Sequence, residues 1–118
     1  MTVSVSPKTH PYHRKNRKQL LRTIKIAVQF ILPDAEVILY GSQARGDASR
    51  NLDWDILVLT DAEVTYQLER NLRRKMDDLS LQADVVISAF VRDLHTWMTP
   101  LAKTSPYHQN IIREGILI

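Results

Sequence analysis

Two short segments of this 118-residue chain carry residue types that suit phosphate and metal chemistry. The first, residues 41–46 (GSQARG), follows an apolar run at residues 37–40 that predicts a buried strand. Because glycine has no side chain, a Gly-Ser turn at the end of a strand lets the backbone approach a phosphate closely. If a short helix begins at Ser42, its amide groups and positive end also face that anion. We therefore expect a phosphate-binding turn at Gly41 and Ser42.

The second segment, residues 53–59 (DWDILVL), reads as a strand that starts with two carboxylates. Strand side chains alternate, so Asp53 and Asp55 should point to one face and Trp54 to the other. Two such acids repel each other by roughly 4 kcal/mol at about 4 Å and an effective dielectric constant near 20. A cation relieves this repulsion, and oxygen ligands beside a phosphate cradle indicate Mg²⁺ with a nucleoside triphosphate.

Composition narrows the class of protein. Hydrophobic residues make up 44% of the chain and charged residues 25%, which is ordinary for a globular domain. We expect a flexible N-terminal arm at residues 1–13 and a single domain at 14–118. The absence of cysteine excludes disulfides and thiolate catalysis, and no apolar run is long enough to span a membrane, so we expect a cytoplasmic protein. A net charge of +3 suits an anionic ligand but does not favour direct nucleic-acid binding.

The order of the expected elements predicts the fold class. Hydrophobic periodicity and turn residues place helices at about 14–32, from a cap at Asp61, at 90–98 and at 107–113, with Gly115 ending the last. Strands are expected at about 35–40, 53–59 and 83–88, the central one buried on both faces. This is an α/β (α+β) pattern, with a small mixed sheet of three to four strands and helices packed on it.

A basic cluster at the start of the first helix leaves two interpretations open. Arg14, Lys15, Arg17 and Lys18 could form a solvated helical turn, or a patch that contacts RNA or an acidic partner. No aromatic residue is interleaved to stack on bases, which weighs against RNA.

The spacing of the two segments resembles a known family. Gly41-Ser42, ten residues and then Asp53-x-Asp55 are similar to the Gly-Ser-x10-Asp-x-Asp signature of the DNA polymerase beta-like nucleotidyltransferases. The form GSQARGD resembles their minimal (MNT) branch, and residues 105–118 resemble the tail of MNT proteins paired with HEPN-domain partners. The resemblance implies a palm-like core. Trp54 departs from the family, which usually has a smaller residue there, and it should pack on the face away from the metals.

The resemblance also implies roles for individual residues. Asp53 and Asp55 would hold two Mg²⁺ ions, and Asp84 would be the third acid, which binds one metal and helps deprotonate the attacking hydroxyl. Ser42 and the backbone around Gly41 would hold the β- and γ-phosphates of ATP. Arg45 would add charge to that site, or would instead be a surface arginine bonded to a neighbouring acid.

The activity implied is Mg-dependent transfer of AMP from ATP to a hydroxyl acceptor. The acceptor would be a tyrosine of a HEPN-domain toxin, which makes the chain an antitoxin and places it in a homo- or hetero-oligomer. Two alternatives stay open: transfer to a small molecule such as an aminoglycoside, and a non-catalytic module that neutralises its partner by contact alone.

Overall fold

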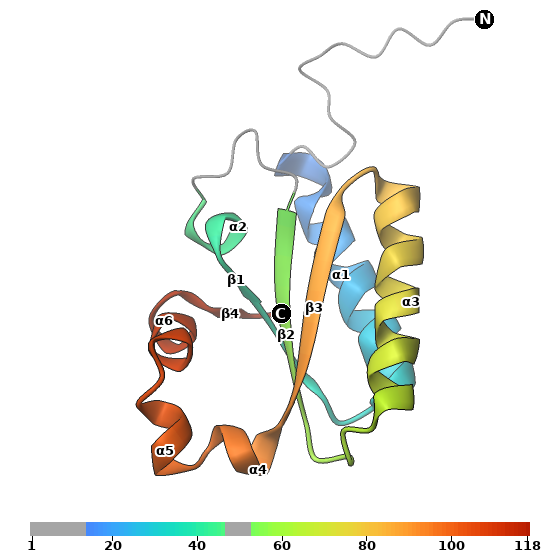
Figure 1. The fold of residues 1–118 in the computed structure, drawn as a ribbon. Coiled ribbons are helices and arrows are strands. Elements are labelled where there is room, and N and C mark those ends of the chain that lie inside the picture. The colour runs from blue at the N-terminus through green and yellow to red at the C-terminus, as the bar shows by residue number, and fades with distance from the viewer. Residues whose placement is uncertain (1–13, 47–52) are drawn as a thin grey trace, which may run out of the picture.

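The computed structural model describes residues 14–46 and 53–118, so the predicted arm at residues 1–13 lies outside the described residues. The predicted α/β class is confirmed (Figure 1). The elements in chain order are α1 (Arg14–Ile31), β1 (Glu36–Tyr40), α2 (Ser42–Arg45), β2 (Asp53–Thr60), α3 (Tyr66–Ala83), β3 (Val86–Asp93), α4 (Leu94–Trp97), α5 (Pro100–Lys103), α6 (Pro106–Glu114) and β4 (Ile116–Leu117).

The strands form one mixed sheet in the order β3-β2-β1-β4. β1 pairs antiparallel with β2 and with β4, whereas β2 and β3 run parallel. The turn after β1 and the start of β2 therefore lie at the same end of the sheet. The start of β3 lies there too, because β3 runs in the same direction as β2. The predicted site residues lie at this end of the sheet.

Each face of the sheet is covered by a different group of helices. On β2, Trp54, Ile56 and Val58 are buried against α1 and α3 in the larger core. Leu57 and Leu59 point to the opposite face and pack with residues of α4 and α6 in a smaller core. Figure 1 shows this division, with α1 and α3 on one side of the sheet and α4 to α6 on the other. Strand alternation therefore puts Asp53 and Asp55 on the face of the smaller core.

The two long helices, α1 and α3, have 18 residues each and bury one apolar stripe apiece. Their other faces carry charged side chains, as expected for amphipathic helices on a sheet. Neither these helices nor any other in the described ranges is long and apolar enough to cross a membrane.

The predicted helix at residues 90–98 is wrong over its first half. Phe90 to Asp93 continue β3, and only Leu94 to Trp97 are helical. Phe90 and Leu94 have helical spacing, but eight consecutive backbone pairings with β2 decide the conformation. Val91 is buried in the larger core, whereas Phe90 is 46% exposed, which is the alternation of a strand.

The predicted cap at Asp61 is also wrong. α3 begins at Tyr66, and the Thr65 hydroxyl accepts a hydrogen bond from the Leu68 amide at 3.1 Å. Asp61 Oδ1 instead lies 3.6 Å from His95 Nε2, and both of these side chains are exposed. At the other end of the chain, α6 ends before Gly115, as predicted, and two further residues add β4 to the sheet.

Candidate active site

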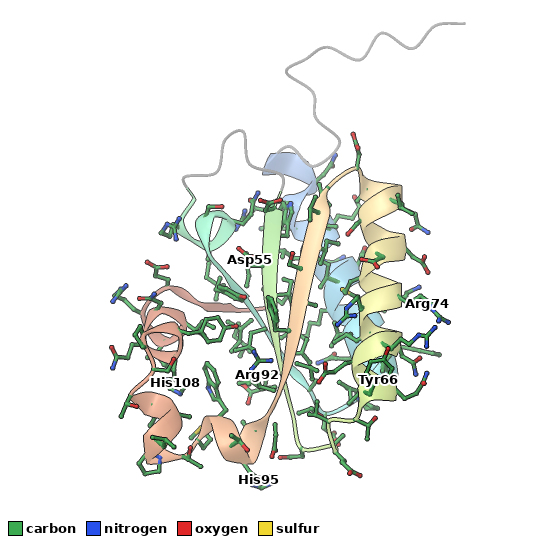
Figure 2. All side chains as sticks on the ribbon, in the orientation of Figure 1. Asp55, Tyr66, Arg74, Arg92, His95 and His108 are labelled. Atoms are coloured by element: carbon green, nitrogen blue, oxygen red, sulfur yellow. The ribbon has the colours of Figure 1, made fainter. Side chains whose placement is uncertain are left out.

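Asp53 and Asp55 lie on the same face of β2, and Asp55 is flanked by one paired residue on each neighbouring strand. Its register partners are Tyr40 on β1 and Ser88 on β3. Asp55 is half-buried, and burial raises the pKa of its carboxyl group, with a further rise from the charge of Asp53. Trp54 is buried on the opposite face. Figure 2 shows Asp55 at the end of β2 nearest α2.

The Gly-Ser turn packs directly against this carboxylate. Gly41 has φ 75° and ψ −156°, and a Cβ added there would stand 2.5 Å from Oδ2 of Asp55. The Gly41 carbonyl accepts hydrogen bonds from the amides of Ala44 and Arg45, both at 3.1 Å, which starts α2 at Ser42. Both the backbone angles and the close approach require glycine. The turn and the Asp55 carboxylate, which the sequence predicts to lie beside each other, are thus in close contact.

Asp84 lies in the turn between α3 and β3, where it is exposed. It is the C-terminal cap of α3 and, within the described ranges, the one non-glycine residue with positive φ (55°). Its amide donates to the Ser80 carbonyl. Val86, two residues later, is the register partner of Asp53. Asp84 is thus at the same end of the sheet as the pair, but the described side chains include no group of three His, Cys, Asp or Glu that could hold a metal.

Arg45, at the end of α2, forms an ion pair with α6. Its Nη1 lies 3.3 Å from Oε2 of Glu114, and both side chains are partly exposed. This contact matches the interpretation of Arg45 as an arginine bonded to an acid. The acid is 69 positions away in the sequence, so only the tertiary structure identifies it. Contact between Arg45 and a phosphate stays a prediction.

Sequence reasoning missed a tyrosine beside Asp55, Tyr40, and a second tyrosine that contacts it, Tyr107. Tyr107 of α6 donates a hydrogen bond to the Tyr40 hydroxyl at 3.2 Å, and the two rings meet edge to face with centroids 5.7 Å apart. The pKa of Tyr40 is raised, first by burial and then by its contact with Tyr107, with a further rise from the charge of Asp55. Tyr40 ends the apolar run before Gly41, a position that could have singled it out. Tyr107 carries no comparable signal.

Arg17, near the start of α1, contacts the turn and β2 from the sheet face of the larger core. Nη1 donates to Oε1 of Gln43 at 3.0 Å, and Nη2 donates to the Gln43 main-chain oxygen at 2.6 Å. Its guanidinium lies over the Trp54 ring, 5.3 Å from the centroid. Arg17 is therefore packed against the protein, so the interpretation of the basic cluster as a solvated turn is wrong for this residue. The interpretation of the cluster as a patch for RNA or an acidic partner stays a prediction.

Comparison with known proteins identifies the class that this fold and site define. The family model described as a nucleotidyltransferase domain matches residues 21–117. The chain therefore belongs to the nucleotidyltransferase domain family, and the predicted resemblance is confirmed.

The chain is also similar to two named proteins of one organism. The chain is 31% identical over 80 residues to MJ0604 of Methanocaldococcus jannaschii, a protein named for an inferred protein adenylyltransferase activity. The match covers 68% of this chain and 73% of MJ0604. MJ0141 of the same organism, named in the same way, is 31% identical over 75 residues, which cover 62% of this chain and 76% of that protein.

Solved structures share the fold. A complex of a tri-AMPylated Shewanella oneidensis HEPN toxin with an MNT antitoxin matches with a TM-score of 0.54 and 19% identity, covering 86% of this chain and 70% of that one. A toxin–antitoxin structure with AMP-PNP matches with a TM-score of 0.50 and 23% identity, covering 87% and 69%. At these identities the likeness shows a common fold.

Proposed function

We propose that this protein is a Mg²⁺-dependent adenylyltransferase that transfers AMP from ATP to a tyrosine hydroxyl of a HEPN-domain toxin, and so acts as an antitoxin. The observation that carries the proposal is the close approach of the Gly41 main chain to the Asp55 carboxylate. This contact joins a turn suited to phosphate with a pair of acids suited to a divalent cation, in a chain whose family performs nucleotidyl transfer.

The residues present fit Mg²⁺. Asp53 and Asp55 offer oxygen ligands from one strand face, and the pKa of Asp55 is raised partly by its neighbour's charge, a repulsion that a cation would relieve. When bound, Mg²⁺ supplies charge that neutralises the triphosphate and acidifies the acceptor hydroxyl. Asp84 would complete the ligand set from the turn before β3. Such a role requires its side chain to turn toward Asp53.

The remaining groups would hold the nucleotide and move the proton. Ser42 and the main chain of the turn would hold the β- and γ-phosphates, with Arg45 adding positive charge. The acceptor oxygen would form a bond to the α-phosphorus as the bond to the pyrophosphate oxygen breaks, and the hydroxyl proton would pass to Asp84. Positioning and electrostatic stabilisation would then account for the rate, without a covalent enzyme intermediate.

A protein acceptor is supported by the relatives. MJ0604 and MJ0141 are named as protein adenylyltransferases, and a structural neighbour contains an AMPylated HEPN toxin. In the described residues, every strand belongs to one sheet with helices packed on it, and no second unit is available to enclose a small acceptor. A partner chain would supply the missing wall of the site.

The test is transfer of label from α-³²P-ATP to a HEPN-domain protein in the presence of Mg²⁺. Asp53→Asn combined with Asp55→Asn should fold and lose about a hundredfold or more of the transfer rate. The matched control is Asp77→Asn with Asp78→Asn, which removes the same charge from exposed acids of α3 and should transfer label normally.

Three results would count against the proposal. Label that stays on nucleotide with the wild-type protein would exclude protein adenylylation. Full transfer by the Asp53/Asp55 double variant would show that these acids do not hold the metal. Neutralisation of a co-expressed toxin by that same variant would favour inhibition by contact alone.

A further inference from the structure

We propose that Arg17 is a positioning residue that holds the phosphate-binding turn at a fixed position relative to β2, the strand that carries Asp53 and Asp55. This inference rests on the proposed function, because it assigns a purpose to the turn at Gly41 and Ser42. Arg17 is 26 positions from Gln43 in the sequence, and no motif connects them. Two hydrogen bonds from its guanidinium connect Arg17 to Gln43, and the same guanidinium contacts the ring of Trp54.

The first contact is with the turn. The two arms of the Arg17 guanidinium donate to the side-chain and main-chain oxygens of Gln43, at 3.0 and 2.6 Å. Gln43 is 7% exposed, and it is the residue directly after Ser42. A planar fork with two fixed donors holds its acceptor in one orientation, which a lysine cannot do. The last carbonyls of a helix have no partner within it, and Arg17 supplies one to α2.

The second contact is with the strand. The Arg17 guanidinium lies 5.3 Å from the centroid of the Trp54 ring, and Trp54 stands between Asp53 and Asp55. Partial burial lowers the pKa of Arg17, as expected for a guanidinium packed against these groups. One side chain of α1 thus touches both halves of the site. The chain between those halves, residues 47–52, lies outside the described residues.

The choice of tryptophan supports this interpretation. Trp54 is 2% exposed, and its Nε1 has no hydrogen-bond partner among the described residues. A buried donor without a partner is destabilising, and phenylalanine would avoid that penalty. The indole ring is, however, the best aromatic partner for a cation. An arginine that needs a broad ring beneath it accounts for tryptophan at this position.

Arg17 acts through other residues rather than on the substrate. Trp54 points into the larger core, on the face opposite to Asp53 and Asp55, so the guanidinium lies behind the turn. A loss of Arg17 should therefore loosen the turn and weaken nucleotide binding, while the acids that perform the chemistry stay in place.

The test compares Arg17→Met and Arg17→Lys with the matched control Arg22→Met, an exposed arginine further along α1. Amide hydrogen exchange reports on the turn without any nucleotide, through the amides of Ala44, Arg45 and Gly46, which donate to the carbonyls of Gly41 and Ser42. Arg17→Met should speed their exchange about tenfold, the scale of a lost charged hydrogen bond, and Arg17→Lys should fall between Arg17→Met and wild type. Arg22→Met should leave it unchanged.

The second readout is nucleotide binding. The dissociation constant for AMP-PNP and the KM for ATP should each rise about tenfold in Arg17→Met, with a smaller change in kcat. Trp54→Phe should show a weaker form of the same effect. If Arg17→Met does not fold, as judged by circular dichroism, Arg17→Lys is compared with Arg22→Lys in its place.

The two readouts separate the possible failures. Unchanged exchange in the turn would overturn the inference whatever the nucleotide does. Faster exchange with unchanged AMP-PNP affinity would show that Arg17 is only structural, which also overturns it. A wild-type protein that binds no AMP-PNP would refute the proposed function itself, and the positioning role would fall with it.

Discussion

The main chain of Gly41 lies against the carboxylate of Asp55, so closely that a Cβ on Gly41 would stand 2.5 Å from Oδ2. This contact spans the two predicted motifs and sets how far the turn stands from the acids. Gly46, at the other end of α2, has the same φ of 75°, but no atom of the described residues would lie within 4 Å of a Cβ added there. The two glycines therefore differ in what surrounds them, and they form a natural comparison.

Gly41→Ala is expected to lower the free energy of unfolding by about 3 kcal/mol and Gly46→Ala by about 1 kcal/mol, because only the first combines a positive φ with a steric clash. Urea denaturation measures both. In an Asp55→Ala background the cost of Gly41→Ala should fall by about 1 kcal/mol or more, since the clashing oxygen is gone. Equal costs for the two glycines, or no coupling to Asp55, would contradict the contact.

Asp55→Asn is expected to stabilise the metal-free protein at neutral pH. The pKa of Asp55 is raised in the folded state by burial and by Asp53, so folding favours its protonated form. Stability is therefore lost as the pH rises from below the unfolded pKa through the raised folded pKa, and asparagine escapes this loss. The melting temperature of Asp55→Asn should exceed that of wild type at pH 7, and the difference should vanish below about pH 4. A difference that is constant with pH would contradict the assignment.

Asp84 can be tested without straining the backbone. Its φ of 55° is one that asparagine and glycine adopt more readily than alanine. Asp84→Asn should cost less than about 0.5 kcal/mol of stability, whereas Asp84→Ala should cost about 1 kcal/mol. If Asp84 is the third acid, Asp84→Asn should still lose about a hundredfold of AMP transfer. A stable Asp84→Asn variant with full activity would leave Asp84 as a helix cap alone.

Variants of Arg45 and of its partner Glu114 can distinguish two roles for the arginine, the ion pair itself and contact with phosphate. Exposed pairs are worth about 0–1 kcal/mol, so Arg45→Gln and Glu114→Gln should each change stability by no more than that. If Arg45 also contacts phosphate, Arg45→Gln should raise the KM for ATP about tenfold, whereas Glu114→Gln should leave it near wild type. Steady-state kinetics with varied ATP make the comparison. Equal effects of the two variants on KM would indicate that Arg45 does not contact phosphate.

The hydrophobic pattern of the sequence predicted those helices and strands whose residues fit only one periodicity, either that of a helix or that of a strand. The apolar stripe of α1 and the continuous apolar run of β2 have no competing interpretation, and both elements lie within a residue of their predicted bounds. The pattern failed at Phe90 to Asp93, where apolar residues fit a helix as well as a strand. Pairing with Leu57 to Thr60, about thirty positions earlier, decided that segment.

The sequence by itself determined the chemistry that this site offers, because residue types and strand alternation are local properties. It placed Asp53 and Asp55 on one face, and it put glycine at a turn that only glycine can make. The tertiary structure alone decided which groups meet there: Tyr40 and Ser88 beside Asp55, Glu114 on Arg45, and Arg17 behind the turn. These neighbours depend on strand register and helix packing between distant segments, which residue spacing within one segment does not encode.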